Sequence, residues 1–184
     1  MPEFTLPSGG LRPISHISYA VENISSAVDH WHRILGAGPF FLVERVTFDE
    51  VTSRGEPAVW DHAAAFGQWG SISIELQQIF SASPSWLVPL FTPGPLPVIN
   101  HVAFITETPE DDSAQLSAAG YEQFLHARFG GVDVRFHDTR AALGHAVEIH
   151  RASDELEAAF ERIAAASRGW DGTDPLRPMG HTPQ

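Results

Sequence analysis

The sequence predicts an α+β fold made of two modules, each with the element order β-α-β-β-β. The same order of strand-like and helix-like segments occurs twice, before and after a proline-rich stretch at residues 83–97. In addition, a histidine in the first strand and a glutamate in the last strand recur in both halves. Because a duplicated unit constrains the whole architecture, these two observations together predict a pair of related modules.

The predicted organisation places a linker between the modules and further segments at both ends of the chain. Its parts are a leader at 1–12, a first module at 13–82, the linker at 83–97, a second module at 98–152, and a C-terminal helix and tail at 153–184. A chain of 184 residues is long enough to bury a substantial core.

The elements of the first module follow from side-chain periodicity. Residues 13–21 alternate as a strand, with His16 and Ser18 on one face and Ile17 on the other. A helix follows, capped by Asn23 or Ser25 and ended by Gly36. Strand-like runs then occupy 40–48, 58–66 and 71–80.

The second module repeats this order. Residues 98–106 form a strand, and Thr108, Pro109 and Gly120 mark the cap, first turn and end of a short helix. Three further strands are predicted at 121–129, 131–139 and 144–152. Ser153 then caps a C-terminal helix, and the tail that follows packs through Trp170.

The repeated markers predict a metal site. SHISYAV and NHVAFIT align with His16 and His101 at the same place, and SISIELQ and GHAVEIH align with Glu75 and Glu148. If the halves pair by approximate twofold symmetry, all four side chains point into one central space. Two imidazoles and two carboxylates suit a divalent ion such as Zn, Ni, Co, Mn, Fe or Mg. Each residue alone would more simply be a surface or hydrogen-bonded group, but a match in pairs favours a shared site.

Composition excludes some classes of binding partner and indicates the cellular compartment. The absence of cysteine excludes disulfides and thiolate ligands, and a net charge of -12 argues against nucleic acid or an anionic membrane as partner. The chain has neither a long apolar run nor a signal-like N-terminus, so a cytoplasmic protein is expected.

The chain resembles the vicinal oxygen chelate superfamily over residues 14–152. The resemblance lies in HISYAVENISSAVDHWHRILGAGPF, IELQQ, NHVAF and GHAVEIH, and GAGPF is most similar to the glyoxalase and epimerase branch. It implies a U-shaped mixed sheet around a central cavity, with helices outside. His16, Glu75, His101 and Glu148 match the four ligand positions of that branch, with Gln77 as the fallback for the second. Homodimers are common in the family, so a homodimer is also an expectation.

The same resemblance implies a metal-dependent lyase or isomerase that removes a proton next to a metal-polarised carbonyl. Its substrate would be a small carbonyl compound or an acyl thioester. Glu148 or Glu75 would act as the base, since ligand carboxylates of relatives can detach. His62 lies near the place of a second acid-base residue in epimerases, although it could instead be a hydrogen-bonded wall residue.

Two other functions remain open at this stage. The first is a metal-independent binding protein of the resistance type, for which the charge of -12 would suit a cationic ligand. The second is an Fe(II) ring-cleaving dioxygenase, against which Glu75 counts because that reaction uses two histidines and one carboxylate. His150 shares the face of Glu148 and could orient it or be solvated. Arg135 and His137 are expected to line the open mouth of the cavity.

Overall fold

The computed structural model describes residues 12–94 and 98–180, so the predicted leader and the end of the linker lie almost wholly outside the described residues. The elements before the linker are β1 (Ile14–Ala20), α1 (Ile24–Leu35), β2 (Phe40–Val46), β3 (Glu50–Ser53), β4 (Glu56–Pro57), β5 (Val59–Trp69) and β6 (Ile72–Ser83). Two short helical turns follow, η1 (Ser85–Leu87) and α2 (Val88–Phe91). The remaining elements are β7 (Ile99–Thr106), α3 (Pro109–Ala118), β8 (Gln123–Phe129), β9 (Val132–His137), α4 (Arg140–Leu143), β10 (Ala146–Arg151), α5 (Asp154–Ser167) and β11 (Leu176–Pro178).

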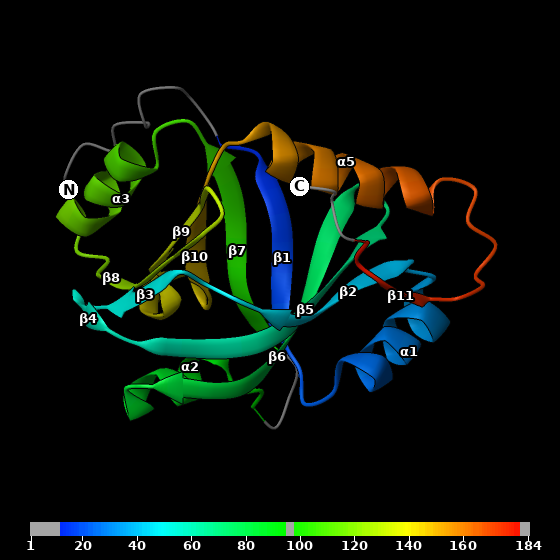
Figure 1. Ribbon diagram of the computed structural model, residues 1–184, viewed down its shortest axis with the longest axis horizontal. Helices are drawn as coiled ribbons and strands as arrows, with labels where there is room; N and C mark the ends of the chain where they lie inside the picture. The colour runs from blue at the N-terminus through cyan, green and yellow to red at the C-terminus, as the bar shows by residue number, and fades with distance from the viewer. Residues whose placement is uncertain (1–11, 95–97, 181–184) are drawn as a thin grey trace.

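The strands of the described part form one mixed sheet with the order β11-β2-β5-β6-β1-β7-β10-β9-β8-β3-β4. The first strands of the two modules, β1 and β7, pair antiparallel at its centre. In each module the first strand is parallel to the last, β1 with β6 and β7 with β10. The sheet curves around a central space (Figure 1). The predicted α+β fold with two paired modules is therefore confirmed.

A small hairpin departs from the predicted order. After β2 the chain crosses to the far edge of the sheet, where β3 pairs with β8 of the second module and β4 pairs with β3 (Figure 1). Glu50 forms an ion pair there with Arg128. The strand predicted at 40–48 thus ends at Val46, because the residues after it connect the two modules.

Helices α1 and α3, one from each module, cover the outer face of the sheet. Asn23 caps α1 by accepting a hydrogen bond from the Ser26 backbone N–H at 2.9 Å, whereas Thr108 makes no such bond at α3. Ile24 and Val28 of α1 are buried against Ile74 and other apolar residues of that face. None of the helices in residues 12–94 and 98–180 is long and apolar enough to cross a membrane.

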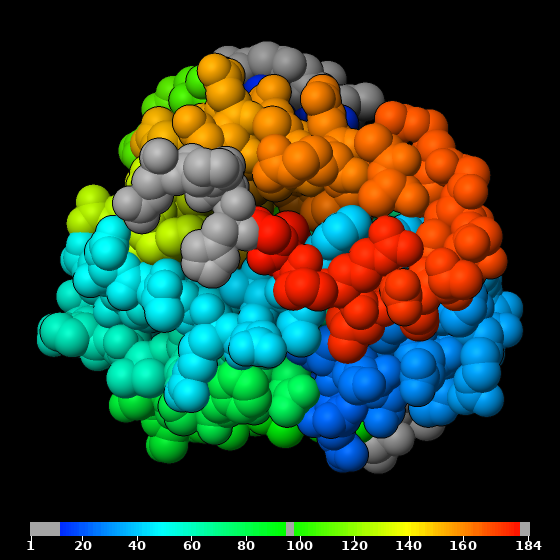
Figure 2. Space-filling model, turned by 45° about the vertical axis from the view of Figure 1, so that its right-hand side comes forward, coloured from blue at the N-terminus to red at the C-terminus, as the bar shows by residue number. Residues whose placement is uncertain are grey.

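The C-terminal helix lies on the opposite side, across the inner face of the sheet (Figure 1). Its Phe160 stacks on His16, with ring centroids 5.6 Å apart and an interplanar angle of 18°. The chain then returns to the sheet, where β11 pairs with β2 and Trp170 packs 5.0 Å from the ring of His32. In Figure 2, α5 and the segment that contains β11 lie side by side on one face. The C-terminal segment therefore covers an edge and part of the interior of the sheet.

A glycine in β5 permits the close packing of two strands. A Cβ atom on Gly67 would lie 2.6 Å from atoms of the Phe40 ring, which is fully buried in β2. We expect Gly67→Ala to lower the free energy of unfolding by about 1–3 kcal/mol, measured by urea denaturation. Gly180→Ala is the control, because no described atom lies within 4 Å of the added methyl group. Equal urea midpoints for Gly67→Ala and the wild type would contradict this packing.

Candidate metal centre

Four buried side chains converge on the inner face of the sheet. The Nε2 atom of His101 lies 3.1 Å from Oε2 of Glu75 and 3.1 Å from Oε2 of Glu148. The Nε2 atom of His16 lies 3.1 Å from Oε2 of Glu148 and 3.6 Å from Oε2 of Glu75. The structure therefore brings together all four residues that the sequence repeats in pairs.

The register of the central strands explains this convergence. Ser18 of β1 pairs with both Glu75 and His101, and Ala103 of β7 pairs with both His16 and Glu148. Each row across the sheet thus has a histidine and a glutamate, one from each module, on either side of a small residue. Because the small side chains leave space above the sheet, the larger ones can lean toward a common centre.

The residue before each of the two histidines contacts its Nδ1 atom, the ring nitrogen that points away from the cluster. Asn100 Oδ1 lies 2.9 Å from Nδ1 of His101, and the Asn100 amide donates to the Leu90 carbonyl at 2.6 Å. Ser15 Oγ lies 3.3 Å from Nδ1 of His16. A hydrogen bond at Nδ1 keeps Nε2 available for a ligand, as at many histidine metal sites. The sequence carried this signal in the repeated polar-His pairs SH and NH, which the prediction did not use.

The charges of the four groups depend on one another. Burial alone would lower the pKa of His101, but its contacts with Glu148 and Glu75 outweigh burial and raise that pKa to about 10. The pKa of His16 is raised for the same reason. Burial would raise the pKa of both carboxyl groups, yet contacts with the histidines hold the pKa of Glu75 and of Glu148 well below the usual range. Without another cation, the carboxylates therefore favour the protonated form of His101 and His16.

The atoms that face the centre lack hydrogen-bond partners among the described residues. They are Nε2 of His16 and His101 and Oε2 of Glu75 and Glu148. Buried polar atoms without partners are costly, and a divalent ion would satisfy this set of two nitrogens and two oxygens. Glu75 contacts both histidines, so the fallback residue Gln77 is not needed to complete the set. These residues fit a divalent ion.

An apolar cavity of about 280 Å³ adjoins the cluster. Its wall includes Val43, Val46, Phe48, Trp60, Phe66, Val134 and Leu156, and it also contains His16, Glu75 and Glu148. His62 lines the same cavity, with its ring stacked 4.1 Å from that of Trp60. Burial lowers the pKa of His62 to about 4, so its ring is neutral at pH 7. The wall residue Arg45 is paired with Asp61.

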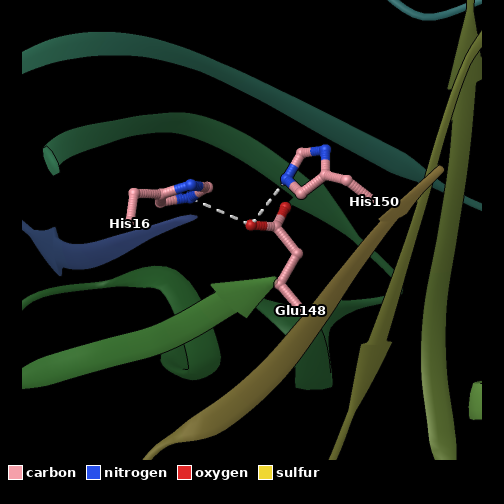
Figure 3. Close-up of side chains that lie close together, drawn as sticks. All are labelled: His16, Glu148 and His150. Atoms are coloured by element: carbon pink, nitrogen blue, oxygen red, sulfur yellow. Dashed lines mark ion pairs between the residues drawn. The ribbon is translucent and has the colours of Figure 1, made fainter. Parts of the chain in front are cut away.

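Three further polar residues of the predicted site, His150, Arg135 and His137, have clear positions. His150 is buried, with Nε2 3.0 Å from Oε2 of Glu148, so it is not solvated (Figure 3). The prediction for Arg135 and His137 is wrong, because both face α3 on the outer side of β9. Arg135 contacts Glu110, and Nε2 of His137 lies 2.8 Å from Ser113 Oγ. The strand alternation was predicted correctly, with Arg135 and His137 on one face of β9. However, the apolar face of β9 faces the cavity, and the polar face points outward.

This fold and this cluster define a protein of the vicinal oxygen chelate class. The sequence profile of the Glyoxalase/Bleomycin resistance protein/Dioxygenase superfamily matches residues 15–142, and the chain belongs to that superfamily. Among curated proteins no sequence gives a significant match.

Solved structures with a similar fold include the following two. A hypothetical protein from Bacillus halodurans is 18% identical, with a TM-score of 0.53 over 78% of this chain and 96% of its own. Methylmalonyl-CoA epimerase from Mycobacterium tuberculosis is 16% identical, with a TM-score of 0.50 over 79% of this chain and 91% of its own. At these identities the likeness concerns the fold alone.

Proposed function

We propose that this protein is a divalent-metal-dependent lyase or isomerase that removes a proton next to a carbonyl group of a small molecule. The observation that carries the proposal is a set of four buried, mutually facing atoms on His16, Glu75, His101 and Glu148 that have no hydrogen-bond partner in the described part of the chain. Three of these residues, His16, Glu75 and Glu148, lie at the wall of an apolar cavity, which gives a substrate access to them. Membership of the superfamily supports the same class of chemistry.

In this proposal the four residues would bind the ion, and the two carboxylates would also transfer protons. A divalent ion held by the four residues would polarise the carbonyl oxygen and stabilise the negative charge that develops on it. We assign the base to Glu148, because its carboxylate lines the apolar cavity that would hold the substrate. Glu75, from the other module, would be the second carboxylate available for proton exchange.

His62 takes a supporting role in this proposal. A general acid-base group works best with a pKa near the working pH, and the pKa of His62 is about 4. Its neutral ring, stacked on Trp60, therefore suits a hydrogen bond to substrate better than proton transfer at pH 7.

The cavity indicates the kind of substrate. Its walls are mainly aromatic and aliphatic, and its cation Arg45 is already paired with Asp61. A volume of about 280 Å³ suits the acyl part of a thioester or a compact carbonyl compound. The same apolar wall also favours a second candidate, a protein that sequesters an apolar ligand without metal. Elemental analysis separates the two, since full ligand binding by a metal-free protein would support sequestration.

Proton exchange in deuterated water tests the proposed reaction. We expect the metal-loaded wild type to exchange the proton next to the carbonyl in at least one member of a panel of 2-methyl acyl-CoA thioesters and hemithioacetals, followed by NMR. Glu148→Gln should lower the exchange rate by about 10²–10⁴-fold, because the amide cannot accept the proton. Glu161→Gln, at an exposed position on α5, is the matched control and should exchange normally. Full exchange by metal-loaded Glu148→Gln would refute the role of this base.

A further inference from the structure

We propose that His150 is an additional ligand of the metal, so that the site has five protein donors. This inference rests on the proposed metal site and extends it beyond the four residues that repeat between the modules. His150 follows Glu148 by two residues on β10, and both side chains are on the inner face of the sheet (Figure 3). Only 9% of His150 is exposed, which is unusual for a histidine without a specific contact.

The distances place His150 in the same cluster as the other histidines. Its Nε2 atom lies 3.0 Å from Oε2 of Glu148, and the corresponding distances from His16 and His101 are both 3.1 Å. One carboxylate oxygen therefore has three imidazole nitrogens at nearly equal distances. Donor atoms of His16, Glu148 and His150 all lie within 4.8 Å of one another, as do those of His16, Glu75 and His101.

The separations of 3.0 and 3.1 Å match those of neighbouring donors bound to a single ion. With metal-ligand distances of about 2.1 Å, neighbouring donors at right angles are about 3.0 Å apart and opposite donors about 4.2 Å apart. The two groups of three share His16, whose Nε2 has one lone pair and can bind only one ion. The shared histidine therefore favours one ion with both groups around it over two separate ions.

The hydrogen bonding of His150 argues against a role limited to orienting Glu148. An imidazole that orients a carboxylate donates a well-aligned hydrogen bond to it and commonly uses its other nitrogen for a second bond. Both ring nitrogens of His150 lack a hydrogen-bond partner among the described residues, despite the short contact with Glu148. The Nε2 atoms of His16 and His101 have the same property. All three rings thus present a nitrogen to the cluster without forming an aligned hydrogen bond.

A fifth donor has two chemical consequences. Three imidazoles and two carboxylates favour Zn, Co, Ni or Fe over Mg, which prefers oxygen ligands. Five protein donors leave one position of an octahedron for substrate, so a substrate that binds through two oxygens would need one carboxylate to leave. Because His150 is beside Glu148, it would keep the ion held by four protein donors when Glu148 detaches.

Proton NMR of the cobalt(II)-loaded, full-length protein tests this inference. Each imidazole bound to cobalt gives one strongly shifted, solvent-exchangeable N–H resonance, so the spectrum counts the coordinated histidines. We expect three such resonances in the wild type and two in His150→Gln. Cobalt affinity, measured by competition with a chelator, should fall in His150→Gln by at least about tenfold. His145→Gln is the matched control, because His145 precedes the same strand and contacts the Ala146 carbonyl instead.

The possible outcomes separate this inference from the proposed function. Two shifted resonances in the wild type would refute the role of His150 and leave the site with four ligands. Three resonances in both the wild type and His150→Gln would also refute it, even with reduced affinity, because His150 would then act only on Glu148. A wild type that binds no cobalt would instead refute the metal-dependent function. The wild-type spectrum alone decides the count if His150→Gln fails to fold.

Discussion

Replacement of Phe136 by alanine is expected to lower the free energy of unfolding by about 3–5 kcal/mol. Phe136 is fully buried in β9, and its ring packs against Trp60, Phe91 and Phe124 at centroid distances of 5.2, 5.7 and 5.8 Å. Phe91 comes from the linker, so this cluster joins the linker to both modules. Loss of the ring would leave a cavity that rigid strands on either side cannot close.

The same substitution should weaken the metal site. The Phe136 ring meets that of His101 edge to face, with centroids 5.0 Å apart, and so supports the imidazole from the side. We expect urea denaturation to show the loss of stability and chelator competition to show weaker metal binding in the folded variant. Phe80→Ala is the control, because 47% of Phe80 is exposed and its loss should cost about 1 kcal/mol or less. Similar stabilities of the two variants would contradict this account of the core.

The central part of the fold could be predicted because its chemistry is periodic and duplicated. Strand alternation places His16 and Glu148 on definite faces, and the repeat shows that these faces belong to one site. The curved sheet was implied by the family resemblance, and in the structure each module repeats the pairing of the other. Such information is present in short stretches of sequence, so a single chain is sufficient to find it.

The features that were missed depend on contacts between distant segments. Strand β3 pairs with β8 across 78 residues from Glu50 to Arg128, and the four residues of β3 give too short a pattern to show this. Likewise, no local pattern shows that α5 lies on the inner face with Phe160 against His16. His150 has no counterpart in the first module, because position 77 is glutamine; strand alternation placed it on the face of Glu148 but left open whether it is solvated.

The thermal stabilisation that a bound metal provides should increase from about pH 6 to about pH 9. In the metal-free protein the pKa of His101 is raised from 6.5 to about 10. A raised folded-state pKa contributes stability that is fully present below 6.5 and is lost as the pH rises toward 10. The lowered pKa of Glu75 and of Glu148 acts in the opposite direction, and its contribution is lost only when the pH falls below 4.5. Between about pH 6 and pH 9, the metal-free cluster should therefore stabilise the fold least at the alkaline end.

Metal binding has the opposite pH dependence, because Nε2 of each histidine must lose its proton before it can bind an ion. Melting temperatures with and without Zn or Co, measured across this pH range after removal of bound metal, should thus diverge as the pH rises. His126→Gln is the control, since His126 pairs with Asp133 away from the cluster and its loss should leave the divergence intact. A difference that stays constant or narrows with rising pH would mean that protons and metal do not compete for His16 and His101. Glu75 and Glu148 thus have a part in both states of the cluster. Without metal, these carboxylates favour protonated imidazoles, and with metal they would neutralise the charge of the ion.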